Sequence, residues 1–157
     1  MTVDLGASAE IDADSSSSKA RVPMTRTLHG GCHCGKVRFE IAGQALHSTI
    51  CHCKDCRGQS GAPILAWAMV PAGQLSTSGE AKNYRSSETG ERFFCSECGT
   101  GLFFSNAPLR QMGMIQVRIA ALDEPGAIAP AMQVQTAERI GWMASAHDLP
   151  SFERFPG

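Results

Sequence analysis

The chain has 157 residues, of which 43% are hydrophobic and 18% charged, and this composition fits one compact domain and excludes collagen-like, coiled-coil and wholly disordered proteins. Fourteen Lys and Arg residues against fifteen Asp and Glu residues give a net charge of −1, which predicts binding neither to nucleic acid nor to an anionic membrane. The seven cysteines are an odd number, so they cannot all pair as disulfides within the chain.

The first 24 residues have neither the charged start nor the apolar stretch of a secretory signal, and they contain a run of four serines. We predict a disordered tail over residues 1–24 and a single β domain over residues 25–157. With no signal and no apolar span expected, the predicted compartment is the reducing cytoplasm, where clustered thiols stay reduced.

Short runs of alternating hydrophobic and polar residues, separated by Gly, Pro and Ser, predict a mainly β chain of antiparallel strands with few short helices. The clearest strand is expected at 36–42, where Val37, Phe39 and Ile41 alternate with charged residues. Further strands are expected at 47–51, 64–70, 81–85, 91–94, 101–104, 114–119 and 132–136. Residues 135–147 could hold one short helix.

The seven cysteines fall into three groups with one or two residues between members. The groups are Cys32 and Cys34, then Cys51, Cys53 and Cys56, then Cys95 and Cys98. In an extended C-x-C both side chains leave the same face of the strand, and a tight turn brings the two sulfurs of a C-x-x-C together. Both spacings suit one tetrahedral ion with metal–sulfur bonds of about 2.3 Å, so zinc is the expected ion.

The cysteine count divides most simply into four and three. The two outer groups supply four thiolates, which close a tetrahedral structural site, whereas the middle group leaves a fourth position for water or substrate. In the alternative division His33, His52 or Asp55 completes the middle group, and both sites are structural. The spacing alone leaves both divisions open.

The charge of the middle group favours thiol chemistry over hydrolysis. Zinc with three thiolates has a formal charge of −1 and is a poor generator of hydroxide at neutral pH. Such a site suits a soft ligand, for example a substrate thiol bound as thiolate. Lys54 and Arg57 flank the group and could bind a carboxylate, and His52 is a candidate acid or base.

Three motifs resemble the glutathione-dependent formaldehyde-activating enzyme family, to which centromere protein V belongs. They are GGCHCG from Gly30, CHCKDCR from Cys51 and RFFCSECGT from Arg92, and the resemblance spans roughly residues 27–156. It implies an Mss4-like fold of antiparallel β-sheets around two zinc sites per chain. It also implies a structural zinc on Cys32, Cys34, Cys95 and Cys98, and a catalytic zinc on Cys51, Cys53 and Cys56.

The activity implied by the resemblance is the addition of glutathione to formaldehyde, which gives S-hydroxymethylglutathione and is formally a carbon–sulfur lyase reaction in reverse. The expected partners are therefore a small thiol and a small electrophile. Where the family often has a histidine, this chain has Gln133, so only the metal ligands are transferred by resemblance. The alternatives are a noncatalytic zinc module that binds a protein partner, and a related enzyme acting on another reactive electrophile.

Overall fold

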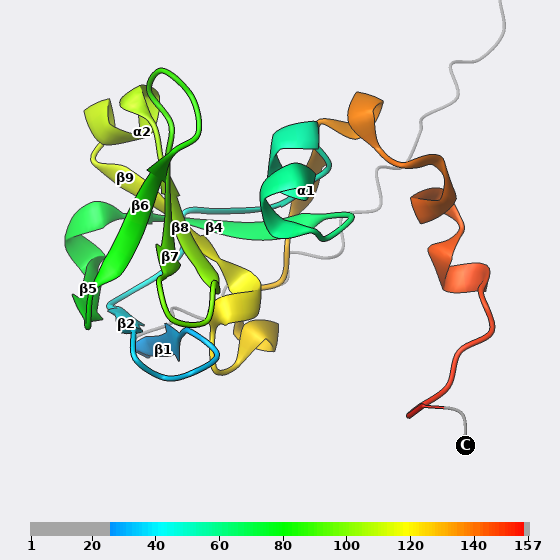
Figure 1. Cartoon of the computed structure of the whole chain (residues 1–157), viewed down its shortest axis with the longest axis horizontal. Helices are drawn as coiled ribbons and strands as arrows, with labels where there is room; N and C mark the ends of the chain where they lie inside the picture. Colours follow the sequence, from blue (N-terminus) through cyan, green and yellow to red (C-terminus); the bar gives the residue numbers. More distant parts are fainter. Residues whose placement is uncertain (1–25, 156–157) are drawn as a thin grey trace, which may run out of the picture.

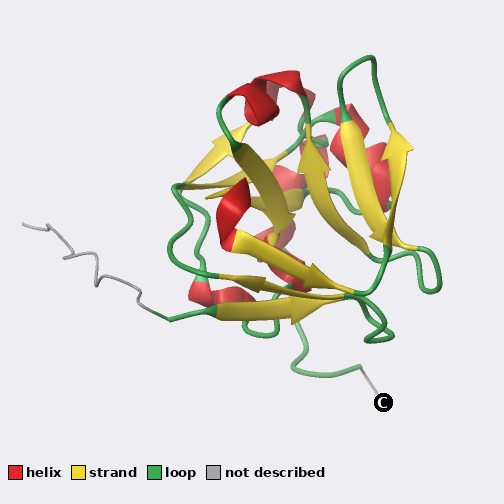
Figure 2. Cartoon of the chain, turned by 90° about the vertical axis from the view of Figure 1, so that its left-hand side faces the viewer, coloured by secondary structure: helices red, strands yellow, loops and turns green. Residues whose placement is uncertain are grey.

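Two β-sheets make up the body of the computed structural model, which describes residues 26–155. The smaller sheet is antiparallel and has the order β1 (Leu28–Gly31), β2 (Arg38–Ile41), β5 (Leu75–Ser78). The larger sheet has the order β10 (Met132–Val134), β3 (His47–Cys51), β4 (Leu65–Pro71), β9 (Met114–Arg118), β8 (Gly101–Ser105), β7 (Glu91–Cys95), β6 (Ala81–Arg85). Figure 2 shows the strands of the two sheets running in different directions.

Two short α-helices connect strands of the larger sheet, α1 (Lys54–Ser60) and α2 (Ala107–Gln111). Each begins after a residue whose side chain accepts a hydrogen bond from a backbone N–H of the first turn, Cys53 for α1 and Asn106 for α2. Six 3-10 turns complete the described elements: Ala72–Gln74, Ile119–Ala121, Pro125–Ala127, Thr136–Glu138, Gly141–Ala144 and Ala146–Asp148. Within residues 26–155, no helix has the length and apolarity needed to cross a membrane.

The core lies between the two sheets. Val37, Phe39 and Ile41 are at most 1% exposed, which confirms the predicted alternation over this strand. They pack in one cluster with residues of the larger sheet, and the rings of Phe39 and Phe103 meet edge to face at 5.3 Å. The smaller sheet thus covers one face of the larger sheet and holds the β1–β2 loop against it.

The predicted mainly β fold class is confirmed, with one correction to the expectation of antiparallel strands. Strand β10 pairs with β3 in parallel, because the 13-residue connection after β9 crosses to the far edge of the sheet. This strand ends at Val134 rather than at residue 136, since Gln135 has a φ of 57° and leaves the extended conformation. Residues 135–147 form 3-10 turns instead of one α-helix.

Four elements were not expected from the sequence. Strands β1 and β5 are four residues long with few apolar side chains, and α1 and α2 are too short to show a helical period. The predicted disordered tail lies outside the described residues. In Figure 1 the segment after residue 139, in orange to red, runs away from the two sheets.

The segment around Asp123 fastens the chain after β9 to the smaller sheet. The Asp123 backbone N–H donates to the His29 carbonyl at 2.9 Å, and its carboxylate accepts hydrogen bonds from both terminal nitrogens of Arg38. Gly30 lies so close to this segment that a Cβ would be 2.5 Å from the Ala121 carbonyl oxygen. The first glycine of the GGCHCG motif is therefore explained by close backbone approach.

We expect Asp123→Asn to cause a small decrease in Tm at pH 7. The hydrogen bonds from Arg38 hold the pKa of Asp123 below its ordinary value. The resulting stabilisation is present above the unfolded-state pKa of about 3.9 and is lost as the pH falls through the lower folded-state pKa. Thermal unfolding of both proteins between pH 3 and 7 checks this, and a difference in Tm that grows on acidification would contradict it.

Candidate metal centre

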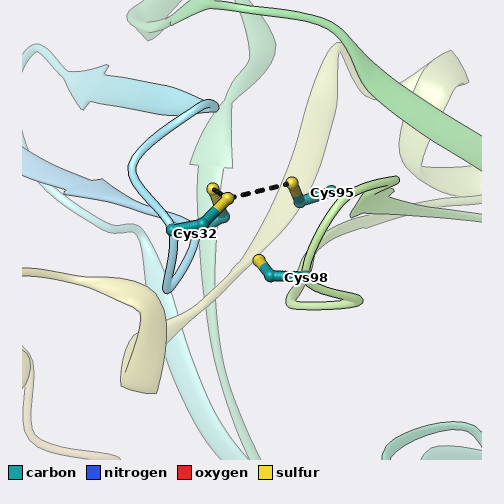
Figure 3. A group of neighbouring side chains, drawn as sticks. Cys32, Cys95 and Cys98 are labelled. Carbon is teal, nitrogen blue, oxygen red and sulfur yellow. Dashed lines mark hydrogen bonds between the residues drawn. The ribbon is translucent and has the colours of Figure 1, made fainter.

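Four sulfurs from two distant loops meet at one point between the sheets. Cys32 and Cys34 lie in the β1–β2 loop, Cys95 ends β7, and Cys98 lies in the β7–β8 loop, with all four sulfurs within 4.8 Å of one another. The Cys32–Cys34 and Cys34–Cys95 sulfur distances are 3.5 and 3.7 Å, close to the about 3.8 Å edge of a zinc–sulfur tetrahedron. Figure 3 shows the labelled sulfurs turned toward a common centre.

Tight turns shape both halves of this outer cluster. The Gly35 N–H donates to the Cys32 carbonyl at 3.0 Å, and the Gly99 N–H donates to the Cys95 carbonyl at 2.9 Å. Both glycines have a positive φ, +79° and +73°, a conformation that glycine adopts without strain. A glycine turn therefore follows each outer pair of cysteines.

Hydrogen-bond donors favour the thiolate state at two of the four outer sulfurs, those of Cys32 and Cys98, whereas the pKa of Cys34 is raised to about 12. The hydroxyl and backbone N–H of Thr100 lower the pKa of Cys98 to about 5. The Thr100 oxygen also accepts from the His33 backbone N–H at 3.1 Å, so it links the two loops. Burial raises the pKa of Cys32. Hydrogen bonds from the Val37 N–H, 3.2 Å from its sulfur, and from the thiols of Cys34 and Cys95 outweigh burial and leave this pKa lowered.

The remaining three cysteines meet around the start of α1. Cys51 ends β3, Cys53 is the N-cap of the helix and Cys56 lies in its first turn, with the three sulfurs within 4.8 Å of one another. The Cys56 N–H donates to the Cys53 sulfur at 3.2 Å. Burial raises the pKa of Cys51 to about 12 and also raises that of Cys56, so a metal ion entering this trio displaces protons.

The donor sets of both clusters suit zinc, since each offers only thiol sulfur at tetrahedral spacing. Within residues 26–155, no histidine or carboxylate joins either cluster at that spacing. The structure therefore brings the cysteines together as four and three, and His33, His52 and Asp55 lie outside the trio.

His52 is buried against β10 rather than turned toward the trio. Its Nε2 lies 2.8 Å from the Gln133 side-chain oxygen, which also accepts from Arg139 at 2.8 Å. Because an amide oxygen only accepts, His52 donates through Nε2. The Gln133 departure thus has a local role, as the acceptor that fixes the ring of His52.

Arg57 and Lys54 have different roles in the structure. Arg57 donates to the His52 carbonyl at 3.0 Å and to the Glu138 carbonyl, so its guanidinium holds the turn after β10 against α1. The Lys54 side chain lines a cleft beside α1. Of the two cations expected to flank the trio, only Lys54 is thus exposed to a ligand in that cleft.

Two arginines that the sequence did not single out lie behind the trio. The apolar wall of the trio includes Trp67 and Phe104. The guanidinium of Arg92 lies 5.0 Å from the centre of the Phe104 ring, and that of Arg118 lies 5.6 Å from the Trp67 ring. In the sequence Arg92 stood out only as the first residue of the RFFCSECGT motif, next to Glu91 at the start of β7.

Gly101 makes room for the guanidinium of Arg118, because a Cβ at this position would lie 2.3 Å from Arg118 Cζ. We expect Gly101→Ala to displace that guanidinium from Trp67, to change the Trp67 fluorescence, and to cost about 1–2 kcal/mol of stability. Fluorescence and urea unfolding in a Trp142→Phe background check this. Gly126→Ala is the matched control, since a Cβ at residue 126 would meet no atom within 4 Å. Unchanged Trp67 emission in Gly101→Ala would contradict the prediction.

Comparison with known proteins assigns the chain to a family. The family model of the glutathione-dependent formaldehyde-activating enzyme matches residues 27–138, which include all seven cysteines. The chain belongs to this family.

A protein of Schizosaccharomyces pombe named as an uncharacterized lyase is 30% identical over 76 residues, which are 48% of this chain and 56% of that protein. The match thus spans little more than half of that relative. A Rhodobacter sphaeroides protein of known crystal structure has a TM-score of 0.55 and 20% identity, over 68% of this chain and 99% of the other. This second likeness supports the fold alone.

Proposed function

We propose that this protein binds two zinc ions and catalyses the addition of a thiol such as glutathione to a small aldehyde such as formaldehyde. Cys32, Cys34, Cys95 and Cys98 would hold a structural zinc, and Cys51, Cys53 and Cys56 a catalytic one. The observation that carries the proposal is the division of the sulfurs into a group of four and a group of three. A tetrahedral ion on three protein ligands keeps one position for substrate.

The reaction forms one carbon–sulfur bond. The thiol loses its proton, its sulfur adds to the aldehyde carbon, and the carbonyl oxygen takes up a proton, so no oxidant or reductant is needed. Zinc on the trio, when bound, would supply a soft Lewis acid that lowers the pKa of a thiol or polarises the aldehyde oxygen. The same catalyst runs the reverse, lyase direction.

The residues around the trio support such chemistry. The buried side chains of Leu65 and Trp67 pack against it and exclude water from one side. A zinc ion with three thiolates would be negatively charged, and the nearby guanidinium of Arg118 offsets that charge. The proposal places the protein in the reducing cytoplasm, because its free thiols must stay reduced to hold metal.

The test is thiol binding and aldehyde exchange by the zinc-loaded full chain. Calorimetry should detect glutathione binding, and exchange NMR with 13C-formaldehyde should show faster interconversion of free aldehyde and thiol adduct than without protein. A panel of other aldehydes and halogenated acceptors then identifies the electrophile. If the loaded protein binds no thiol, the proposal is wrong and a noncatalytic zinc module is favoured.

A further inference from the structure

Arg92 is a buried cation whose charge is incompletely paired. Its side chain is only 6% exposed, and its Nη1 has no hydrogen-bond partner among the described residues. The nearest carboxylate, that of Asp55, lies 3.9 Å from Nη2 and is 74% exposed. Burying a guanidinium N–H without an acceptor is costly, so this position favours an added acceptor.

A second guanidinium strengthens the need for an anion. Arg118 lies close enough to Arg92 for the two charges to repel, and burial together with that repulsion lowers the pKa of Arg118. The two arginines flank β8, on β7 and β9. Lys54 adds a third cation at the cleft that Arg92 lines.

That cleft is open to solvent and large enough for a small peptide. Its volume is about 560 Å³, and it lies between α1 and strands β6 and β7. Its lining includes Lys54, Asp55, Gln59, Tyr84, Ser86 and Arg92. Asp55 directly precedes Cys56, so the cleft runs along the helix that contains Cys56 and begins directly after Cys53.

We propose that Arg92 binds a carboxylate of the thiol substrate in this cleft, which makes the preferred substrates acidic thiols rather than neutral or cationic ones. The inference rests on the proposed function. A guanidinium presents a planar pair of donors that matches a carboxylate, and a partly desolvated contact of this kind discriminates strongly against an ester. The substrate sulfur would then lie at the trio while its carboxylate lies at the base of the cleft.

The experiment measures binding of three thiols to the zinc-loaded full chain by calorimetry: glutathione, glutathione diethyl ester and cysteamine. On the unaltered protein we expect the diethyl ester to bind roughly 10- to 100-fold more weakly than glutathione. Arg92→Gln should weaken glutathione binding by a similar factor and leave cysteamine binding and the zinc content unchanged. Arg85→Gln is the matched control, since Arg85 is exposed and donates to the Glu88 carbonyl.

Equal affinities of the unaltered protein for glutathione and its diethyl ester would overturn the inference. This comparison uses no variant, so the inference can be tested even if Arg92→Gln does not fold. Equal loss of glutathione and cysteamine binding in Arg92→Gln also overturns it, because a merely structural role of Arg92 would affect both thiols. Binding of no thiol by the unaltered protein overturns the proposed function as well, whereas tight binding of cysteamine and of the ester leaves that function standing.

Discussion

Cys53→Ala should release one of two zinc ions per chain and slow thiol–aldehyde exchange roughly a thousandfold, while the protein stays folded. The reason is geometric. The variant would keep only two thiolates, which hold zinc poorly, and no other histidine or carboxylate of residues 26–155 joins Cys51 and Cys56 at metal-binding spacing. Cys53 lies at the start of α1, outside the main core cluster, so its loss leaves the packing between the sheets intact. Metal analysis, circular dichroism and the exchange measurement check this outcome.

Cys53→Ser provides a matched control for the helix. The Cys53 sulfur accepts from the Cys56 N–H, and a serine oxygen can replace it as N-cap, whereas alanine cannot. Both variants should lose zinc and activity, but only Cys53→Ala should also lose about 1 kcal/mol of stability. Two zinc ions and an undiminished exchange rate in either variant would show that the trio is not the reactive centre.

Cys95→Ser should prevent cooperative folding. Cys95 is 1% exposed in the core cluster, and its sulfur lies 3.7 Å from that of Cys34, so the outer cluster joins the two sheets. Structural zinc contributes about 10–16 kcal/mol of apparent binding free energy in small domains, which is as large as the about 5–15 kcal/mol stability of a typical protein. Thermal unfolding followed by near-ultraviolet circular dichroism checks the prediction.

Removal of zinc from the unaltered protein is an independent measurement of the same effect. A strong chelator should unfold the unaltered chain when the zinc of the four-cysteine cluster is lost. The Cys53→Ala protein should begin with one ion but unfold at the same chelator concentration. A Cys95→Ser protein with unchanged Tm would show that the core between the sheets is sufficient without the outer ion.

Strands with clear alternation were predictable, and strands without it were not. Residues 36–42 contain β2, because Phe39 and Ile41 on one face of this strand pack in the core while Glu40 on the other face is exposed. By contrast, β1 and β5 are held mainly by their pairing to β2, a non-local contact that leaves little trace in their own residues. The same holds for the parallel pairing of β10 with β3, which depends on where the long connection leads.

The spacing within each cysteine group is a local property, and so are the glycines that follow the outer pairs, because a chelating turn needs only neighbouring residues. The three groups were therefore readable from the sequence, whereas the meeting of the two outer groups is a long-range contact that the fold makes. Which histidine would complete the trio was not readable, and the fold gives His52 a different partner in Gln133.

The charges around the trio could come only from strand pairing. Arg92 stands opposite Phe104, and Arg118 stands opposite Trp67, in registers that join β7 with β8 and β4 with β9. Arg92 on β7 and Arg118 on β9, far apart in the chain, thus create one cationic wall behind the cysteine trio. Each closely spaced cysteine group follows from local chain geometry, whereas the meeting of the outer groups and the charges beside the trio follow from long-range packing, and that physical difference separates the two kinds of prediction for this protein.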